Sequence, residues 1–148
     1  MGILFCYDDG EDMEGKVEFL EHTADLKIRF TAQTLEDLLT LCARTLRDYL
    51  VGPLDAEGEE EVHTTVEGDD ALERFISALN EILFSLQTRR FMISTVRVQK
   101  AGQAWNMVFT GCKGMGRKAA TEIKAATYHQ ATFEEKPGGI EAVVVFDL

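Results

Sequence analysis

The sequence predicts a single α+β domain in which two helices pack on a largely antiparallel sheet. Its 148 residues are about the length of one domain. Two segments carry apolar residues at helical spacing, and several others are short, rich in β-branched residues and bounded by turn residues. The expected order is two strands, a helix, a strand, a helix and four strands, which indicates the α+β class.

The first fifteen residues are expected to form an acidic, mobile extension, so that the domain spans residues 16–148. This segment starts apolar, but residues 8–15 are mostly acidic and hold too few apolar groups to fold alone. Strands are then expected at Val17–Leu20 and Leu26–Thr31. Alternation along the second strand puts Asp25 on its wetter face, where the carboxylate is available to a ligand.

Both helices have recognisable ends. The first is expected to begin after Thr34, which resembles the start of a capping box, and to end before Gly52. The second is expected to begin after Asp70 and to close at Gln87-Thr88. Each carries an apolar stripe that is more typical of a core face than of a cofactor site, so both helices need a sheet to cover.

The remaining strands are expected mainly in the second half of the chain. Phe91–Lys100 and Ala104–Phe109 flank a short loop of hairpin type. Residues 122–133 alternate as one long strand, which would place His129 on the apolar face. A turn rich in glycine then leads into Ile140–Phe146, whose nearly continuous apolar residues are typical of a strand covered on both faces.

Charge and cysteine usage restrict the class of protein. The net charge of −11 argues against a general nucleic-acid binder, because such binding depends on cations that neutralise phosphates. Eight basic residues nevertheless lie between Arg89 and Lys124, where they could steer a partner or simply solvate a hairpin. Three widely separated cysteines, without a signal peptide or a membrane-length apolar run, favour a reducing setting, which is the cytoplasm or, as the alternative, the nucleus.

The stretch Glu21–Asp25 is the first candidate for a binding site. His22 stands three residues before a carboxylate, between two expected strands. His22 and Asp25 could therefore converge on one ligand across a tight turn, with His22 orienting the carboxylate. Alternatively, His22 and Thr23 could merely bond the backbone of the turn itself.

The second candidate is the end of the chain. Alternation puts Asp147 on the same face as Val145, where its carboxylate needs a partner or exposure at the end of the strand. If Leu148 is the natural terminus, its α-carboxylate adds another anionic group. Together with Asp25, these groups would form an oxygen-only cluster that prefers Ca²⁺ or Mg²⁺ to zinc.

Three segments resemble the signatures of the archease family in residues, order and spacing: Phe19–Asp25, Thr121–His129 and Phe146–Leu148. The resemblance covers about residues 16–148. It implies an archease-like fold and a small protein factor that activates the RtcB-type RNA-splicing ligase, the enzyme that joins tRNA exons. Ala120 stands where the family usually has glycine, which predicts a differently shaped loop before the second segment.

The resemblance also implies a divalent-metal site at Asp25, Asp147 and Leu148. The supporting positions expected around this site are His22, Thr23, Glu122, Lys124 and His129. His129 has a second interpretation, as a core or rim histidine without a binding role.

The sequence shows no activated nucleophile, so no catalytic residue is expected. The expected partner is the ligase, without stable nucleic-acid binding and without a membrane. One alternative is a chaperone or adaptor for another tRNA-processing enzyme such as a tRNA methyltransferase. Another is a metallohydrolase with Asp25, Asp147 and His22 as ligands, because a bound cation can generate hydroxide.

Overall fold

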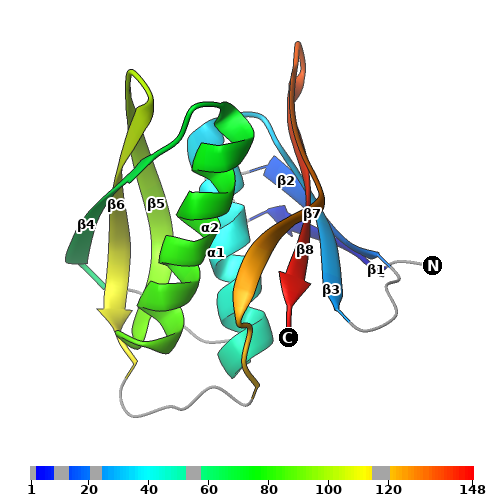
Figure 1. Ribbon diagram of the computed structural model, residues 1–148. Coiled ribbons are helices and arrows are strands. Elements are labelled where there is room, and N and C mark those ends of the chain that lie inside the picture. The colour runs from blue at the N-terminus through cyan, green and yellow to red at the C-terminus, as the bar shows by residue number, and fades with distance from the viewer. Residues whose placement is uncertain (1–2, 9–13, 21–24, 53–57, 115–120) are drawn as a thin grey trace.

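Two helices lie between two antiparallel sheets in the computed structural model (Figure 1). The structure describes residues 3–8, 14–20, 25–52, 58–114 and 121–148. The strands are β1 (Ile3–Asp8), β2 (Glu14–Leu20), β3 (Leu26–Ala32), β4 (Glu60–Glu67), β5 (Phe91–Ala101), β6 (Ala104–Lys113), β7 (Ala125–Lys136) and β8 (Gly139–Asp147), and the helices are α1 (Leu35–Val51) and α2 (Ala71–Gln87). One sheet has the order β1-β2-β3-β8-β7 and the other has the order β4-β6-β5.

The predicted fold class is confirmed, with one difference in the layers. The strands form two sheets, and both helices are covered on opposite sides. Helix α1 therefore buries residues around much of its circumference, including Leu38, Leu41 and Leu46. A sequence pattern that shows an apolar stripe does not tell whether one sheet or two will cover it.

Side-chain caps fix the start of each helix where the sequence predicts it. The Thr34 hydroxyl accepts a hydrogen bond from the Asp37 N–H at 3.1 Å at the start of α1. At the start of α2, the Asp70 carboxylate accepts from the Glu73 N–H at 2.8 Å, and Glu73 accepts in return from the Asp69 N–H at 3.1 Å. These bonds satisfy backbone donors that have no partner within the helix.

The free edge of β5 is closed by side chains of α1. Because β5 is the last strand of its sheet, its outward backbone groups have no neighbouring strand. Side chains at successive turns of α1 bond these groups instead. The contacts are Val98 N–H to Glu36 (3.0 Å), Val96 N–H to Thr40 (2.9 Å), Thr40 hydroxyl to Val96 C=O (3.2 Å), Arg44 to Ser94 C=O (2.7 Å) and Arg47 to Ile93 C=O (2.9 Å).

We expect Thr40→Val to destabilise the domain by about 1–3 kcal/mol, because it leaves the buried N–H of Val96 without its acceptor. Thr45→Val is the matched control on the same helix. The Thr45 hydroxyl is also buried, but within the described part of the chain it has no hydrogen-bond partner. Urea denaturation should show a lower free energy of unfolding for Thr40→Val and not for Thr45→Val. Equal decreases in both variants would contradict a stabilising role for the hydrogen bonds between Thr40 and Val96.

Strand β7 contains a large bulge that the sequence did not predict. Thr127 pairs with Val145, but the next pair is Thr132 with Val143, so β7 holds three residues more than β8 in this interval. An odd insertion reverses which residues face the core. Buried Ala126 is even-numbered, whereas Phe133, which packs on the core, is odd-numbered.

The predicted position of His129 on the apolar face is therefore wrong. His129 lies within the bulge and is exposed, together with its neighbours Tyr128 and Gln130. Gln130 has a φ of 55°, and its side-chain oxygen accepts from the Lys27 ammonium at 3.2 Å across β8. The bulge thus folds over the outer face of the sheet, where Val145 is buried outside the main core.

The N-terminal segment also differs from its prediction. Residues 3–8, expected to be part of a mobile extension, form β1 and pair with β2, which begins at residue 14. The short, unbroken apolar run Ile3–Tyr7 is compatible with such a strand. The division of the chain at residue 15 into an extension and a domain stays a prediction.

Cys42 should be chemically inert in the folded protein. Its thiol is fully buried on α1, and this burial raises its pKa well above the ordinary value. Little reactive thiolate is then present near neutral pH. Site-resolved mass spectrometry after alkylation should find Cys42 unmodified in the native protein and modified in denaturant. Native modification at the rate of a free thiol would contradict this packing.

Within the described residues, no helix is long and apolar enough to cross a membrane.

Candidate metal site at the end of strand β8

Strand pairing brings Asp25 and Asp147 to the same end of the five-stranded sheet. The last pair between β3 and β8 is Leu26 with Phe146; Asp147 is the next residue of β8, and Asp25 directly precedes β3. Residues opposite one another in an antiparallel pair share a face of the sheet and have Cβ atoms roughly 5 Å apart. Asp25 is half-buried and Asp147 is exposed, so the two carboxylates lie on the side open to solvent.

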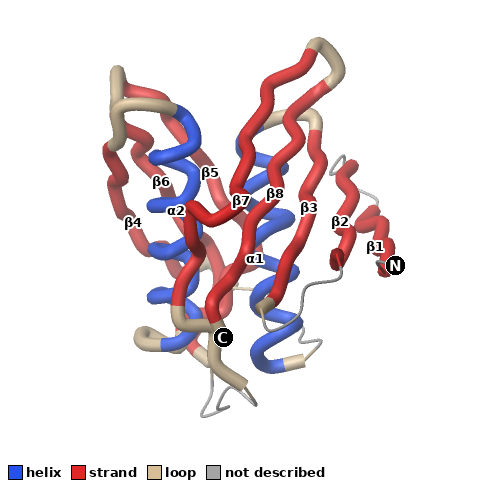
Figure 2. The backbone as a smooth tube through the Cα atoms, turned by 45° about the vertical axis from the view of Figure 1, so that its right-hand side comes forward, coloured by secondary structure: helices blue, strands red, loops and turns tan. Residues whose placement is uncertain are grey.

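The backbone of Asp147 is held from the other side by β7. Asp147 pairs with Ala125, and its carbonyl oxygen accepts from the Lys124 N–H at 2.7 Å. Figure 2 shows β8 running between β3 and β7 to the C-terminus. Lys124 and Ala125 of the segment Thr121–His129 therefore lie directly beside Asp147 of the segment Phe146–Leu148.

The oxygen donors at this end fit a hard divalent cation. Within the part of the chain that the structure describes, His, Cys, Asp and Glu side chains form no group of three or more that could hold a metal ion. The predicted donor set is the pair of carboxylates of Asp25 and Asp147, joined by an α-carboxylate if Leu148, which is 39% exposed, is the natural terminus. Such a set is hard and lacks nitrogen and sulfur, and it leaves room for water ligands, as Ca²⁺ and especially Mg²⁺ require.

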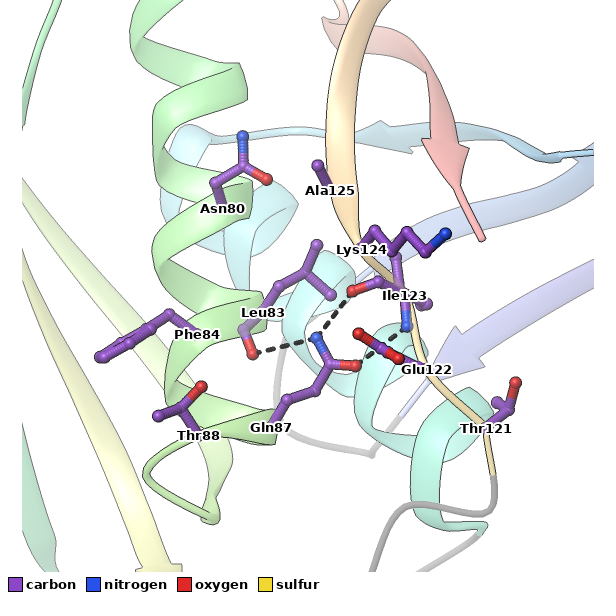
Figure 3. A pocket seen from close by; sticks show the side chains of 10 residues that line it. All are labelled: Asn80, Leu83, Phe84, Gln87, Thr88, Thr121, Glu122, Ile123, Lys124 and Ala125. Carbon is purple, nitrogen blue, oxygen red and sulfur yellow. Dashed lines mark hydrogen bonds between the residues drawn. The ribbon is translucent and has the colours of Figure 1, made fainter.

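A groove of about 870 Å³ lies next to this strand end, between α2 and the segment that leads into β7 (Figure 3). Its lining residues are Asn80, Leu83, Phe84, Gln87, Thr88, Thr121, Glu122, Ile123, Lys124 and Ala125. Phe84 is 45% exposed, and the Arg89 guanidinium lies over its ring at 5.2 Å from the centroid. The groove therefore offers both apolar and charged groups at the surface.

The amide side chains of Asn80 and Gln87 join α2 to the start of β7 and to the residues just before it. Gln87 donates to the Ile123 carbonyl at 2.8 Å and accepts from the Ile123 N–H at 2.9 Å. Asn80 makes the same paired contacts with Ala126, at 3.2 and 2.8 Å. Seven residues of helix rise about 10.5 Å, and three residues of extended chain span about 10 Å, so both amides can bond at once.

Of the five residues predicted to support the metal site, two lie at the groove and one lies away from the strand end. Glu122 and Lys124 are exposed at the groove, and Lys124 contacts Asp147 through its backbone. His129 lies in the bulge beyond Thr127, further along β7 from the strand end. His22 and Thr23 lie outside the described residues, so their predicted roles stay predictions.

Sequence reasoning missed Asn80 and Gln87. Gln87 was noted only as the end of a helix, and its contacts with Ile123 span 36 positions of sequence. The sequence feature that could have indicated these contacts is the spacing of Asn80 and Gln87, which are seven residues apart on one helix. This spacing puts both on one face, but it does not say which backbone they bond.

The fold and this strand end define a class of protein: a small α+β domain with two helices between two sheets and an aspartate beside each of two paired strands, β3 and β8, at the same end of the sheet. The chain belongs to the archease family, because the model of the Archease protein family matches residues 17–148.

Relatives and solved structures agree with this membership. The chain is 36% identical over 143 residues to Protein archease of Methanopyrus kandleri, covering 88% of this chain and 98% of that protein. It is 30% identical to Protein archease of Ictalurus punctatus, covering 90% and 85%. The fold is similar to the solution structure of protein 1598 of Methanobacterium thermoautotrophicum, with a TM-score of 0.66, 22% identity and coverage of 88% and 96%. It also resembles the crystal structure of a Thermotoga maritima archease described as a possible chaperone, with a TM-score of 0.61, 25% identity and coverage of 87% and 94%.

Proposed function

We propose that this protein is a non-catalytic activator of an RtcB-type tRNA-splicing RNA ligase, which promotes guanylylation of the ligase and its multiple turnover. Membership of the archease family supports this proposal. The ligase is the proposed partner, and the buried thiol of Cys42 is compatible with a reducing compartment, the cytoplasm or the nucleus.

The observation that carries the proposal is the meeting of the described parts of three motif segments at one surface. Asp25 ends the first segment, Lys124 belongs to the second, and Asp147 with Leu148 forms the third. Asp147 is exposed at its strand end, where its side chain packs little, and a second carboxylate at the same end would repel it unless a cation is shared. We therefore assign these carboxylates to binding.

Asp25, Asp147 and the Leu148 carboxylate would hold one Ca²⁺ or Mg²⁺ ion in this proposal. When bound, the ion would neutralise these carboxylates and offer coordination positions to oxygen atoms of water or of the partner. The chain's own residues do the positioning. The β3–β8 pairing sets the spacing of the two aspartates, and the Lys124 N–H fixes the backbone of Asp147.

The test adds a substoichiometric amount of this protein to purified ligase with GTP and divalent metal. A catalytic activator should increase the fraction of guanylylated ligase and allow each ligase molecule to join many RNA ends. The matched control replaces this protein with an equal amount of an unrelated acidic domain. No gain in guanylylation or turnover over that control would overturn the proposal.

A chaperone or adaptor for another tRNA-processing enzyme is a second candidate, favoured by the description of the Thermotoga maritima archease as a possible chaperone. The acidic surface implied by the net charge of −11 would then aid docking and solubility. Pull-down followed by an aggregation assay separates the two functions. Capture of a ligase alone, with no methyltransferase kept soluble, would exclude the adaptor function.

A further inference from the structure

Gln87 connects helix α2 to the strand end that carries the carboxylates. We infer that Gln87 is a positioning residue for the metal site, an inference that rests on the proposed function. It acts on the ligands through the backbone of Ile123 and Lys124, without contact with the ion. Three consecutive links, each made by hydrogen bonds or by a covalent bond, join Gln87 to Asp147.

The first link is the pair of hydrogen bonds between Gln87 and Ile123. Ile123 precedes the start of β7 at Ala125, so its backbone is not part of the strand ladder. The amide of Gln87 supplies a donor for its carbonyl and an acceptor for its N–H (Figure 3). The Ile123 side chain is fully buried, which anchors the same residue from the core.

The second link is the peptide bond from Ile123 to Lys124, and the third is the Lys124 N–H. This N–H donates to the carbonyl of Asp147 at 2.7 Å. A planar peptide unit transmits the orientation of Ile123 directly to the Lys124 N–H. Loss of the Gln87 amide would therefore loosen the backbone of Asp147 and, with it, the spacing between Asp147 and Asp25.

Asn80 provides a matched comparison within the same helix. It bonds Ala126 with the same paired geometry, two helical turns away. Ala126, however, lies inside β7 and pairs with Phe146, so the strand ladder still holds it when Asn80 is changed. Both amides stabilise the attachment of α2, and only the contacts of Gln87 hold a segment outside the ladder.

The test uses Gln87→Met and Asn80→Leu, which keep side-chain size and remove hydrogen bonding. Hydrogen exchange of individual amides is measured without metal, and Ca²⁺ and Mg²⁺ binding is measured by calorimetry. In Gln87→Met the amides of Ile123 and Lys124 should exchange about tenfold faster. The affinity of Gln87→Met for Ca²⁺ should fall about tenfold, which is typical when a residue that orients a metal ligand is removed. Asn80→Leu should speed exchange at Ala126 and leave the affinity within about twofold.

Unchanged exchange at Lys124 in Gln87→Met would overturn the inference, and so would equal losses of affinity in the two variants. If Gln87→Met does not fold, Gln87→Glu replaces it, because this variant keeps the acceptor for the Ile123 N–H and loses the donor to the Ile123 carbonyl. Wild-type protein that binds neither ion would overturn the proposed metal site itself. The exchange rates would then still show whether Gln87 orders this strand end.

Discussion

Asp147→Ala should abolish activation of the ligase while the domain stays folded. Asp147 is exposed at the end of β8, so its side chain contributes little packing, and its proposed role is that of one metal ligand. The free energy of unfolding should change by no more than about 0.5 kcal/mol, as for other surface substitutions away from special features. In the metal-free protein, removing one of two neighbouring carboxylates could even raise the melting temperature. The measurements are ligase turnover and thermal denaturation on the same preparation.

Glu141→Ala is the matched control for this substitution. Glu141 lies on the same strand and the same face as Asp147, six residues away, and contacts Arg29 and Lys136. Six residues of strand span about 20 Å, which is beyond the reach of the proposed site. Activation should therefore be unchanged in Glu141→Ala. Full activation by Asp147→Ala would show that the activity does not depend on this strand end.

Phe146→Ala should have the largest effect on stability, a loss of about 3–5 kcal/mol. Phe146 is fully buried in the core and lies between Leu26 of β3 and Ala126 of β7. Replacement by alanine leaves a cavity between the sheet and the helices, and neighbouring strands cannot collapse to fill it without breaking their pairing. Guanidinium denaturation measures this loss directly. A loss below about 1 kcal/mol would show that the strand end is loosely packed.

Phe146 and Asp147 are expected to have different roles, one in stability and the other in function. Phe146 and Asp147 are adjacent in β8, and strand alternation turns them to opposite faces. Phe146→Ala should lower the stability of the domain, and Asp147→Ala should abolish activation of the ligase. A protein in which both substitutions only lower stability would have no separate site at this end.

The helices and the central strands could be predicted because their signals are local. Thr34 and Asp70 are caps that act within one turn, and Ile140–Phe146 is a nearly continuous apolar run, interrupted by Glu141, that forms most of β8. Each of these sequence features acts on residues that are adjacent to it in the chain, so it can be recognised without knowing the fold.

Features that depend on distant contacts could not be predicted. The bulge at residues 128–131 depends on how β7 pairs with β8, and its residues alternate in the sequence as an ordinary strand would. The second sheet layer and the bonds of Gln87 to Ile123 likewise arise from segments that are far apart in the chain. The neighbouring positions of Asp25 and Asp147 follow from the register of β3 and β8, and their role as ligands stays a prediction.

Calorimetric titration of Ca²⁺ and of Mg²⁺ into the wild-type protein and into Asp147→Ala tests directly whether the carboxylates at this strand end bind a metal ion. We expect saturable binding of one ion to the wild-type protein, and binding to Asp147→Ala that is weaker by at least about tenfold. Equal binding of either ion to both proteins, or no binding to the wild type, would contradict the assignment of these carboxylates as a metal site.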